Sequence, residues 1–222
     1  MQEIMDKTLL IGFFASSVIL AITPGPDILF VLAESLAKGA KRGILITAGL
    51  CLGICMHTLL CAAGISLIIA QTPSLYAAIQ CLGAIYLAVL AFEASREKIG
   101  ASSTNFSLPE TPQNGESLPK TLARGFLMNA LNPKVGLFFL AFMPQFISEE
   151  GLPKPAQFAV LGLVFMVSAA ICFCAVSVLA AKFASIFKSV KFWILMKWAR
   201  ALLFASISFI ILLEMAKTLS DA

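Results

Sequence analysis

The chain has 222 residues, of which 59% are hydrophobic and 13% are charged, and its formal net charge is +4. Soluble domains carry about 45–50% apolar and about 25% charged residues, so this composition excludes an ordinary water-soluble fold. The basic residues are spread between apolar segments instead of forming one patch, which argues against a nucleic-acid-binding protein.

Six apolar segments follow one another along the chain, and most reach the length of about 20 residues that a helix needs to cross a bilayer. They are Thr8–Leu32, Ile44–Ala70, Leu75–Phe92, Leu122–Phe146, Ala156–Ala180 and Phe192–Leu213. We therefore expect an all-α integral membrane protein with six transmembrane helices. The first segment lacks the basic start and small-residue cleavage site of a signal peptide, so we expect an uncleaved helix.

A polar stretch rich in Pro, Ser, Thr and Asn divides the chain at residues 97–120. Such a composition cannot bury a core, and we interpret it as a cytoplasmic linker between residues 1–96 and 121–222. Each part then holds three helices, and an odd number of crossings makes the second part enter the membrane from the opposite side. The sequence thus predicts two inverted three-helix repeats, an architecture common in secondary transporters.

The basic residues also predict the orientation of the six helices. Loops on one side carry Lys38, Lys41, Arg42, Arg96, Lys98, Lys120, Arg124, Lys182, Lys188, Lys191, Lys197 and Arg200, whereas the other side has Lys7, Lys154 and Lys217. Cytoplasmic loops are enriched in Lys and Arg, so both termini are expected outside the cytoplasm. Lys197 and Arg200, near the start of the last segment, are expected to extend toward the headgroups.

Two proline motifs interrupt the first and fourth segments. The first is TPGPD at residues 23–27, and the second is NPK at residues 132–134. Proline lacks a backbone donor and prevents a regular helix, so both segments are expected to break. Carbonyls freed in hydrocarbon need a partner, and broken backbone is tolerated only where it is buried or lines a cavity.

Each motif also carries a charge at membrane depth. Asp27 lies eleven residues before Lys38, which is about 16 Å along a helix, and Lys134 is similarly deep. An unpaired charge there costs at least about 2.5–3.5 kcal/mol. Our hypothesis is that Asp27 and Lys134 face a common polar cavity, either paired or each holding one end of a zwitterion.

These motifs, six apolar segments and a polar middle loop resemble the LysE/RhtB family of bacterial amino-acid exporters, over nearly the whole chain. The resemblance implies a multi-pass protein of the inner membrane that exports an amino acid or derivative from the cytoplasm, driven by an ion gradient. We expect the proton gradient, and a chain this small is compatible with a homodimer. The substrate-binding residues that the resemblance implies are Thr23, Pro24, Gly25, Pro26, Asp27, Asn132, Pro133 and Lys134.

Other functional classes have weaker support. No G-x-x-x-x-G-K-[ST] phosphate loop occurs, so ATP drive and a bound cofactor are not expected. No serine–histidine or paired-carboxylate arrangement at membrane depth favours an enzyme. A metal-ion transporter or channel remains an alternative, because Cys51, Cys55 and His57 have side chains that bind soft metals. However, positions 55 and 57 point to different sides of a helix.

A membrane thiol-redox protein is a further alternative because six cysteines lie in the apolar segments, including Cys172 and Cys174. Buried cysteine more often serves as a small hydrophobic residue. His57 is a secondary candidate for the polar cavity. Glu34, near the cytoplasmic end of the first segment, is interpreted as a surface charge.

Overall fold

The computed structural model describes residues 7–23, 25–65, 68, 72–97, 99, 117–148, 151–180, 182, 186 and 189–220. Within these residues the protein is helical and has no strands. The elements are α1 (Lys7–Ile22), α2 (Pro26–Lys38), α3 (Ala40–Leu60), η1 (Cys61–Ile65), α5 (Pro73–Arg96), α7 (Leu118–Ala130), α8 (Pro133–Leu137), η2 (Phe138–Phe142), η3 (Met143–Phe146), α9 (Lys154–Val178) and α11 (Val190–Ser220).

Length and hydropathy make this a multi-pass membrane protein. Four stretches are long and apolar enough to cross a bilayer, namely Ala40–Gly64, Ser74–Arg96, Lys154–Val178 and Val190–Leu213. Two further spans result if each bent pair of helices counts as one, the pairs being α1 with α2 and α7 with the segment Pro133–Phe146. The described residues therefore provide four to six spans.

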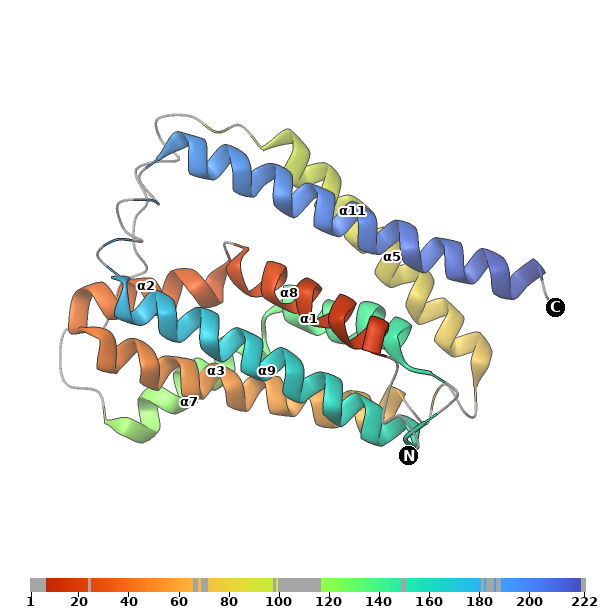
Figure 1. The fold of residues 1–222 in the computed structure, drawn as a ribbon, viewed down its shortest axis with the longest axis horizontal. Coiled ribbons are helices and arrows are strands. Elements are labelled where there is room, and N and C mark those ends of the chain that lie inside the picture. The colour runs from red at the N-terminus through yellow and green to blue at the C-terminus, as the bar shows by residue number, and fades with distance from the viewer. Residues whose placement is uncertain are drawn as a thin grey trace.

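The helices form two groups, as Figure 1 shows. Helix α3 packs on α7, α9 and α2, and α9 also packs on α1. The other group is the pair α5 and α11, which pack along each other and contact the first group through η2. Helix α1 begins and α11 ends toward the right of Figure 1, whereas α2, α5 and α9 end toward its left.

Small residues let α3 approach its neighbours closely. A Cβ at Gly49 would lie 2.4 Å from the Leu122 carbonyl oxygen and 2.9 Å from the Cα of Gly125. A Cβ at Gly53 would meet the Asn129 side chain at 2.7 Å. The contact that these glycines allow is thus internal, between α3 and α7, and it brings Asn129 close to α3.

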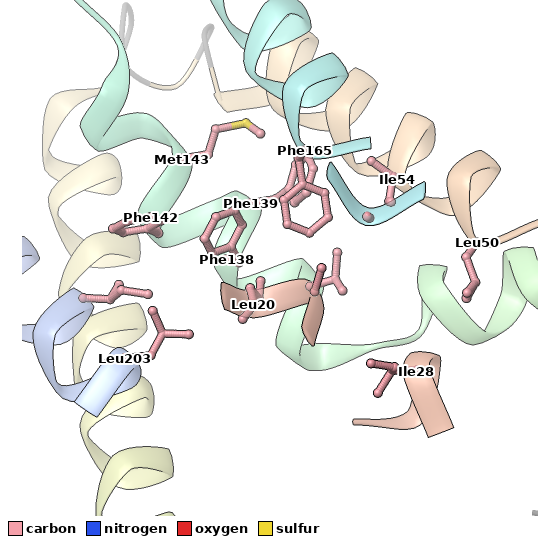
Figure 2. Packing of buried hydrophobic residues seen from close by; sticks show 14 of the residues in the cluster. Leu20, Ile28, Leu50, Ile54, Phe138, Phe139, Phe142, Met143, Phe165 and Leu203 are labelled. Atoms are coloured by element: carbon pink, nitrogen blue, oxygen red, sulfur yellow. The ribbon is translucent and has the colours of Figure 1, made fainter. Parts of the chain in front are cut away.

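Aromatic side chains pack around η2, shortly after the break between α7 and α8 (Figure 2). The ring centroid of Phe138 lies 5.6 Å from that of Phe13 on α1 and 5.2 Å from that of Phe165 on α9. Phe139 packs against Phe165 at 5.2 Å in an edge-to-face arrangement. This buried cluster holds η2 between α1 and α9, and it fixes the position of the short helix α8 that carries Lys134.

Candidate functional site

The first helix break lies at the motif predicted to cause it. Helix α1 ends at Ile22, α2 begins at Pro26, and the two are bent by 54°. Pro26 occupies the first turn of α2, where a backbone N–H has no helical partner. Pro24 lies outside the described residues.

The second break has a similar form. Helix α7 ends at Ala130, and the segment beginning at Pro133 is bent from it by 52°. Pro133 again stands in the first turn, and the Asn132 side-chain oxygen accepts a hydrogen bond from the backbone nitrogen of Lys134 at 3.0 Å. The NPK sequence therefore ends one helix and caps the next.

Lys134 joins the two breaks. Its Nζ donates to the carbonyl oxygen of Leu20 at 3.1 Å and to that of Thr23 at 3.2 Å. These oxygens belong to the end of α1, where the break removes their helical partners. The carbonyls that the sequence left without a partner are thus satisfied by the lysine of the other motif. Gly25 lies so close that a Cβ there would be 3.1 Å from Nζ.

Asp27 is buried, with 2% of its surface exposed. Its Oδ2 accepts a hydrogen bond from Asn129 Nδ2 at 3.3 Å, whereas its Oδ1 has no hydrogen-bond partner among the described residues. The Asn132 carboxamide also lies near this carboxylate, although its Nδ2 forms no hydrogen bond within the described part of the chain. Sequence reasoning missed Asn129; a polar residue one helical turn before Asn132 in an apolar segment was the available signal.

Asp27 and Lys134 are neighbours without a direct ion pair among the described residues, but each acts on the other electrostatically. Both line a small chamber of about 10 Å³. That volume holds at most about one water molecule, so a zwitterionic solute does not fit between them in this conformation.

A much larger cavity, of about 740 Å³, lies on the other side of Lys134. It separates the α5–α11 pair from the broken helices, and its walls include Gly25, Pro26, Asn132, Pro133 and Lys134. Seven of the eight predicted site residues are described, and five of them line this cavity. Lys134 faces both spaces, whereas Asp27 lines only the small chamber.

The wall formed by α5 and α11 was not predicted. It includes the largely apolar side chains of Tyr86, Leu90 and Phe204 and the charged residues Glu93, Arg96, Glu97 and Arg200. Arg200, which was expected to extend toward the headgroups, lines the cavity and pairs with Glu97 at the end of α5. This wall could not be predicted from local sequence because the pairing of α5 with α11 is a long-range contact.

His57 and the cysteines lie apart from the large cavity. The His57 ring is buried against Phe139, and its Nε2 lies 3.3 Å from the Asn129 carbonyl oxygen. All six cysteines are free thiols, and within the described ranges no group of three or more His, Cys, Asp or Glu residues is placed to hold a metal ion.

Glu34 corrects another prediction. It was interpreted as a surface charge, but its side chain is fully buried. Its carboxylate forms ion pairs with Arg42 at 3.0 Å, Lys38 at 3.3 Å and Arg124 at 3.7 Å. The prediction was wrong because these cations come from α2, α3 and α7, whose convergence around one carboxylate depends on the tertiary fold.

Comparisons with known proteins show the family of this chain and several relatives. The family described as "LysE type translocator" matches residues 18–214. A leucine efflux protein of Klebsiella pneumoniae is 30% identical over 171 residues, covering 75% of each chain. The uncharacterized membrane protein YrhP of Bacillus subtilis is 32% identical over 150 residues, or 64% of this chain and 69% of that protein. A leucine efflux protein of Salmonella typhimurium is 28% identical over 152 residues, or 67% of this chain and 68% of that protein. No solved structure matches the chain.

Proposed function

Because the chain belongs to the family of LysE-type translocators, we propose that it is a secondary transporter that exports an amino acid or amino-acid derivative from the bacterial cytoplasm. The observation that carries the proposal is the meeting of two broken helices around Lys134, beside a cavity of about 740 Å³. Sites for small molecules typically measure about 300–1,000 Å³. Broken transmembrane helices around a cavity are typical of the substrate sites of secondary transporters.

The proposed transport site consists of Thr23, Pro24, Gly25, Pro26, Asp27, Asn132, Pro133 and Lys134. Lys134 offers the positive charge that a substrate carboxylate needs. Asp27 lines the small chamber beside it, which suits a group that gains and loses a proton during the cycle. The proton gradient is therefore our proposed driving force. Two relatives are named leucine efflux proteins, which supports leucine or a similar apolar amino acid as the substrate.

We also propose six spans arranged as two inverted repeats, 1–96 and 121–222, joined by the linker 97–120. Under that relation α3 corresponds to α9, and the span containing α1 corresponds to the span containing α7. The packing of α3 on α7 then has its counterpart in the packing of α9 on α1, and both contacts are present. The two bends, 54° and 52°, are also alike.

Efflux from living cells tests the proposed function. Cells that express the chain are loaded with each of the twenty radiolabelled standard amino acids, and release is compared with empty-vector cells and with the Asp27→Asn variant. We expect faster release of leucine or a related apolar amino acid, and its loss in Asp27→Asn at equal membrane abundance. The proposal fails if no amino acid leaves faster than from empty-vector cells.

We also propose that the protein forms a homodimer, which has a separate test. Light scattering of the purified protein, corrected for bound detergent, should give a mass near twice 23.7 kDa. A mass near 23.7 kDa would contradict it.

A further inference from the structure

Arg200 is a further cation that lines the cavity, besides Lys134 and Arg96. Arg200 comes from α11, ten residues after the helix begins, and its side chain is 28% exposed. Its Nη2 pairs with a carboxylate oxygen of Glu97 at the end of α5. Its buried Nε has no hydrogen-bond partner among the described residues. The guanidinium thus retains an unused donor.

Arg200 and Lys134 line the same cavity, and the guanidinium acts on the ammonium as a like charge. Two cations that face a cavity with low-dielectric walls repel each other, and an anion placed between them relieves that repulsion. Glu97 neutralises Arg200 from the α5 side. Lys134 has only backbone carbonyl oxygens as its hydrogen-bond partners in the described part of the chain.

The chemistry of the two donors selects a carboxylate. A guanidinium presents a planar fork that binds a carboxylate through two parallel hydrogen bonds, and an ammonium adds a compact charge. Nearby, Tyr86, Leu90 and Phe204 offer apolar surface that would receive an apolar side chain. One cavity therefore provides both an anion site and an apolar surface.

We propose that the carboxylate of the substrate binds between Lys134 and Arg200, and that it displaces the Glu97 carboxylate from Arg200. Glu97 then acts as an internal placeholder that keeps the guanidinium paired while the cavity is empty. This inference rests on the proposed function and adds two specificity-determining residues outside the proline motifs. It requires that the substrate carry a free carboxylate, and that removal of Glu97 strengthen binding.

Calorimetric binding to the purified full-length protein tests the proposal with three probes. L-leucine has a carboxylate and an ammonium, L-leucinamide lacks the carboxylate, and 4-methylpentanoate lacks the ammonium. The variants are Arg200→Gln and Glu97→Gln. Lys197→Gln is the matched control, because it removes a positive charge one helical turn earlier, from a residue whose Nζ lies over the Trp198 ring at 5.2 Å.

We expect Arg200→Gln to bind L-leucine and 4-methylpentanoate about 10- to 100-fold more weakly than the wild type does. This factor corresponds to the loss of about 1.5–3 kcal/mol from hydrogen bonds to a charged group. The affinity for L-leucinamide should change little. Glu97→Gln should bind both carboxylates more tightly than the wild type, an outcome that damage to the fold would not produce. Lys197→Gln should match the wild type.

The proposal is overturned if Arg200→Gln weakens the binding of L-leucinamide as much as the binding of L-leucine. It is also overturned if Glu97→Gln does not bind the two carboxylate probes more tightly than the wild type. Failure of the proposed function looks different. In that case no standard amino acid is exported. The affinity for 4-methylpentanoate still falls from Glu97→Gln to the wild type and from the wild type to Arg200→Gln.

Discussion

Lys134 shows how a charge is accommodated inside an apolar bundle. A lysine in hydrocarbon is costly, and so are the carbonyl oxygens left free where a helix breaks. The hydrogen bonds from its Nζ to Leu20 and Thr23 offset both costs at once. This places the lysine of one proline motif on the backbone of the other, and makes each break depend on its partner.

Replacing Lys134 by methionine should therefore destabilise the protein as well as abolish export. The substitution leaves two carbonyl oxygens without their donor, and a buried unsatisfied acceptor costs about 1–3 kcal/mol. The measurement is thermal unfolding of the purified protein in detergent, alongside efflux. Lys134→Arg, which keeps a charged donor, is the control and should retain more stability. Equal melting temperatures of Lys134→Met and wild type would contradict this role.

Glu34 illustrates a buried charge that several elements share. Its carboxylate pairs with Lys38 on its own helix, Arg42 on α3 and Arg124 on α7. Arg124 also lies over the Phe30 ring at 4.8 Å, and Arg42 Nη1 donates to Thr121 Oγ1. The cluster therefore connects the first and second parts of the chain at the end where α2 meets α3.

Glu34→Gln should destabilise the protein by about 3–5 kcal/mol, because breaking a buried ion pair leaves uncompensated charge. Arg42→Gln should cost a similar amount. The double variant should cost clearly less than the sum of the two, since the residues share one interaction. Chemical unfolding of the wild type, the two single variants and the double variant gives these free energies. If the effects of Glu34→Gln and Arg42→Gln simply add, the two residues have no interaction energy and the prediction is wrong.

At the scale of elements, the contact between α3 and α7 depends on the absence of side chains. Gly49 faces backbone atoms of Leu122 and Gly125, which cannot move aside as a flexible side chain would. Close helix approach of this kind is typical of membrane bundles, where small residues allow backbone-to-backbone packing.

Gly49→Ala should accordingly destabilise the bundle by about 1–3 kcal/mol, the usual cost of overpacking. Gly64→Ala is the matched control, because a Cβ there meets nothing within 4 Å. Thermal unfolding of the two variants in the same detergent measures the difference. If Gly64→Ala lost as much stability as Gly49→Ala, the close approach would not be the cause.

The helices themselves were largely predictable, because apolar length and proline chemistry are local properties. The first segment breaks at the TPGPD motif, and the fourth breaks at Asn132. Pairings between distant helices were not predictable. The burial of Glu34 and the position of Arg200 each depend on which helix packs against which, and the site therefore gained Asn129, Glu97 and Arg200 only from the structure.

At the scale of the molecule, the arrangement supports the proposed orientation. Helix α1 begins and α11 ends at the same end of the bundle (Figure 1), as an even number of crossings requires. The basic residues Lys38 and Arg96 end α2 and α5 at the opposite end, and basic loops face the cytoplasm.

We predict that the C-terminus faces the periplasm. Alkaline phosphatase fused after residue 222 should be active, because that enzyme works only outside the cytoplasm, whereas green fluorescent protein at the same place should be dark. Fusions after Glu97 should give the reverse pattern. A bright fluorescent protein at the C-terminus would contradict the proposed six spans or their orientation.

The hydrogen bonds of Lys134 also bear on what an exporter does when the cytoplasm holds nothing to export. A lysine held by the backbone of α1 keeps the two broken helices together. Under the proposed proton coupling, an empty protein that changed conformation freely would let protons flow back without cargo. The bond would thus act as a brake on futile cycling, so that idle copies in the membrane do not drain the gradient that drives them.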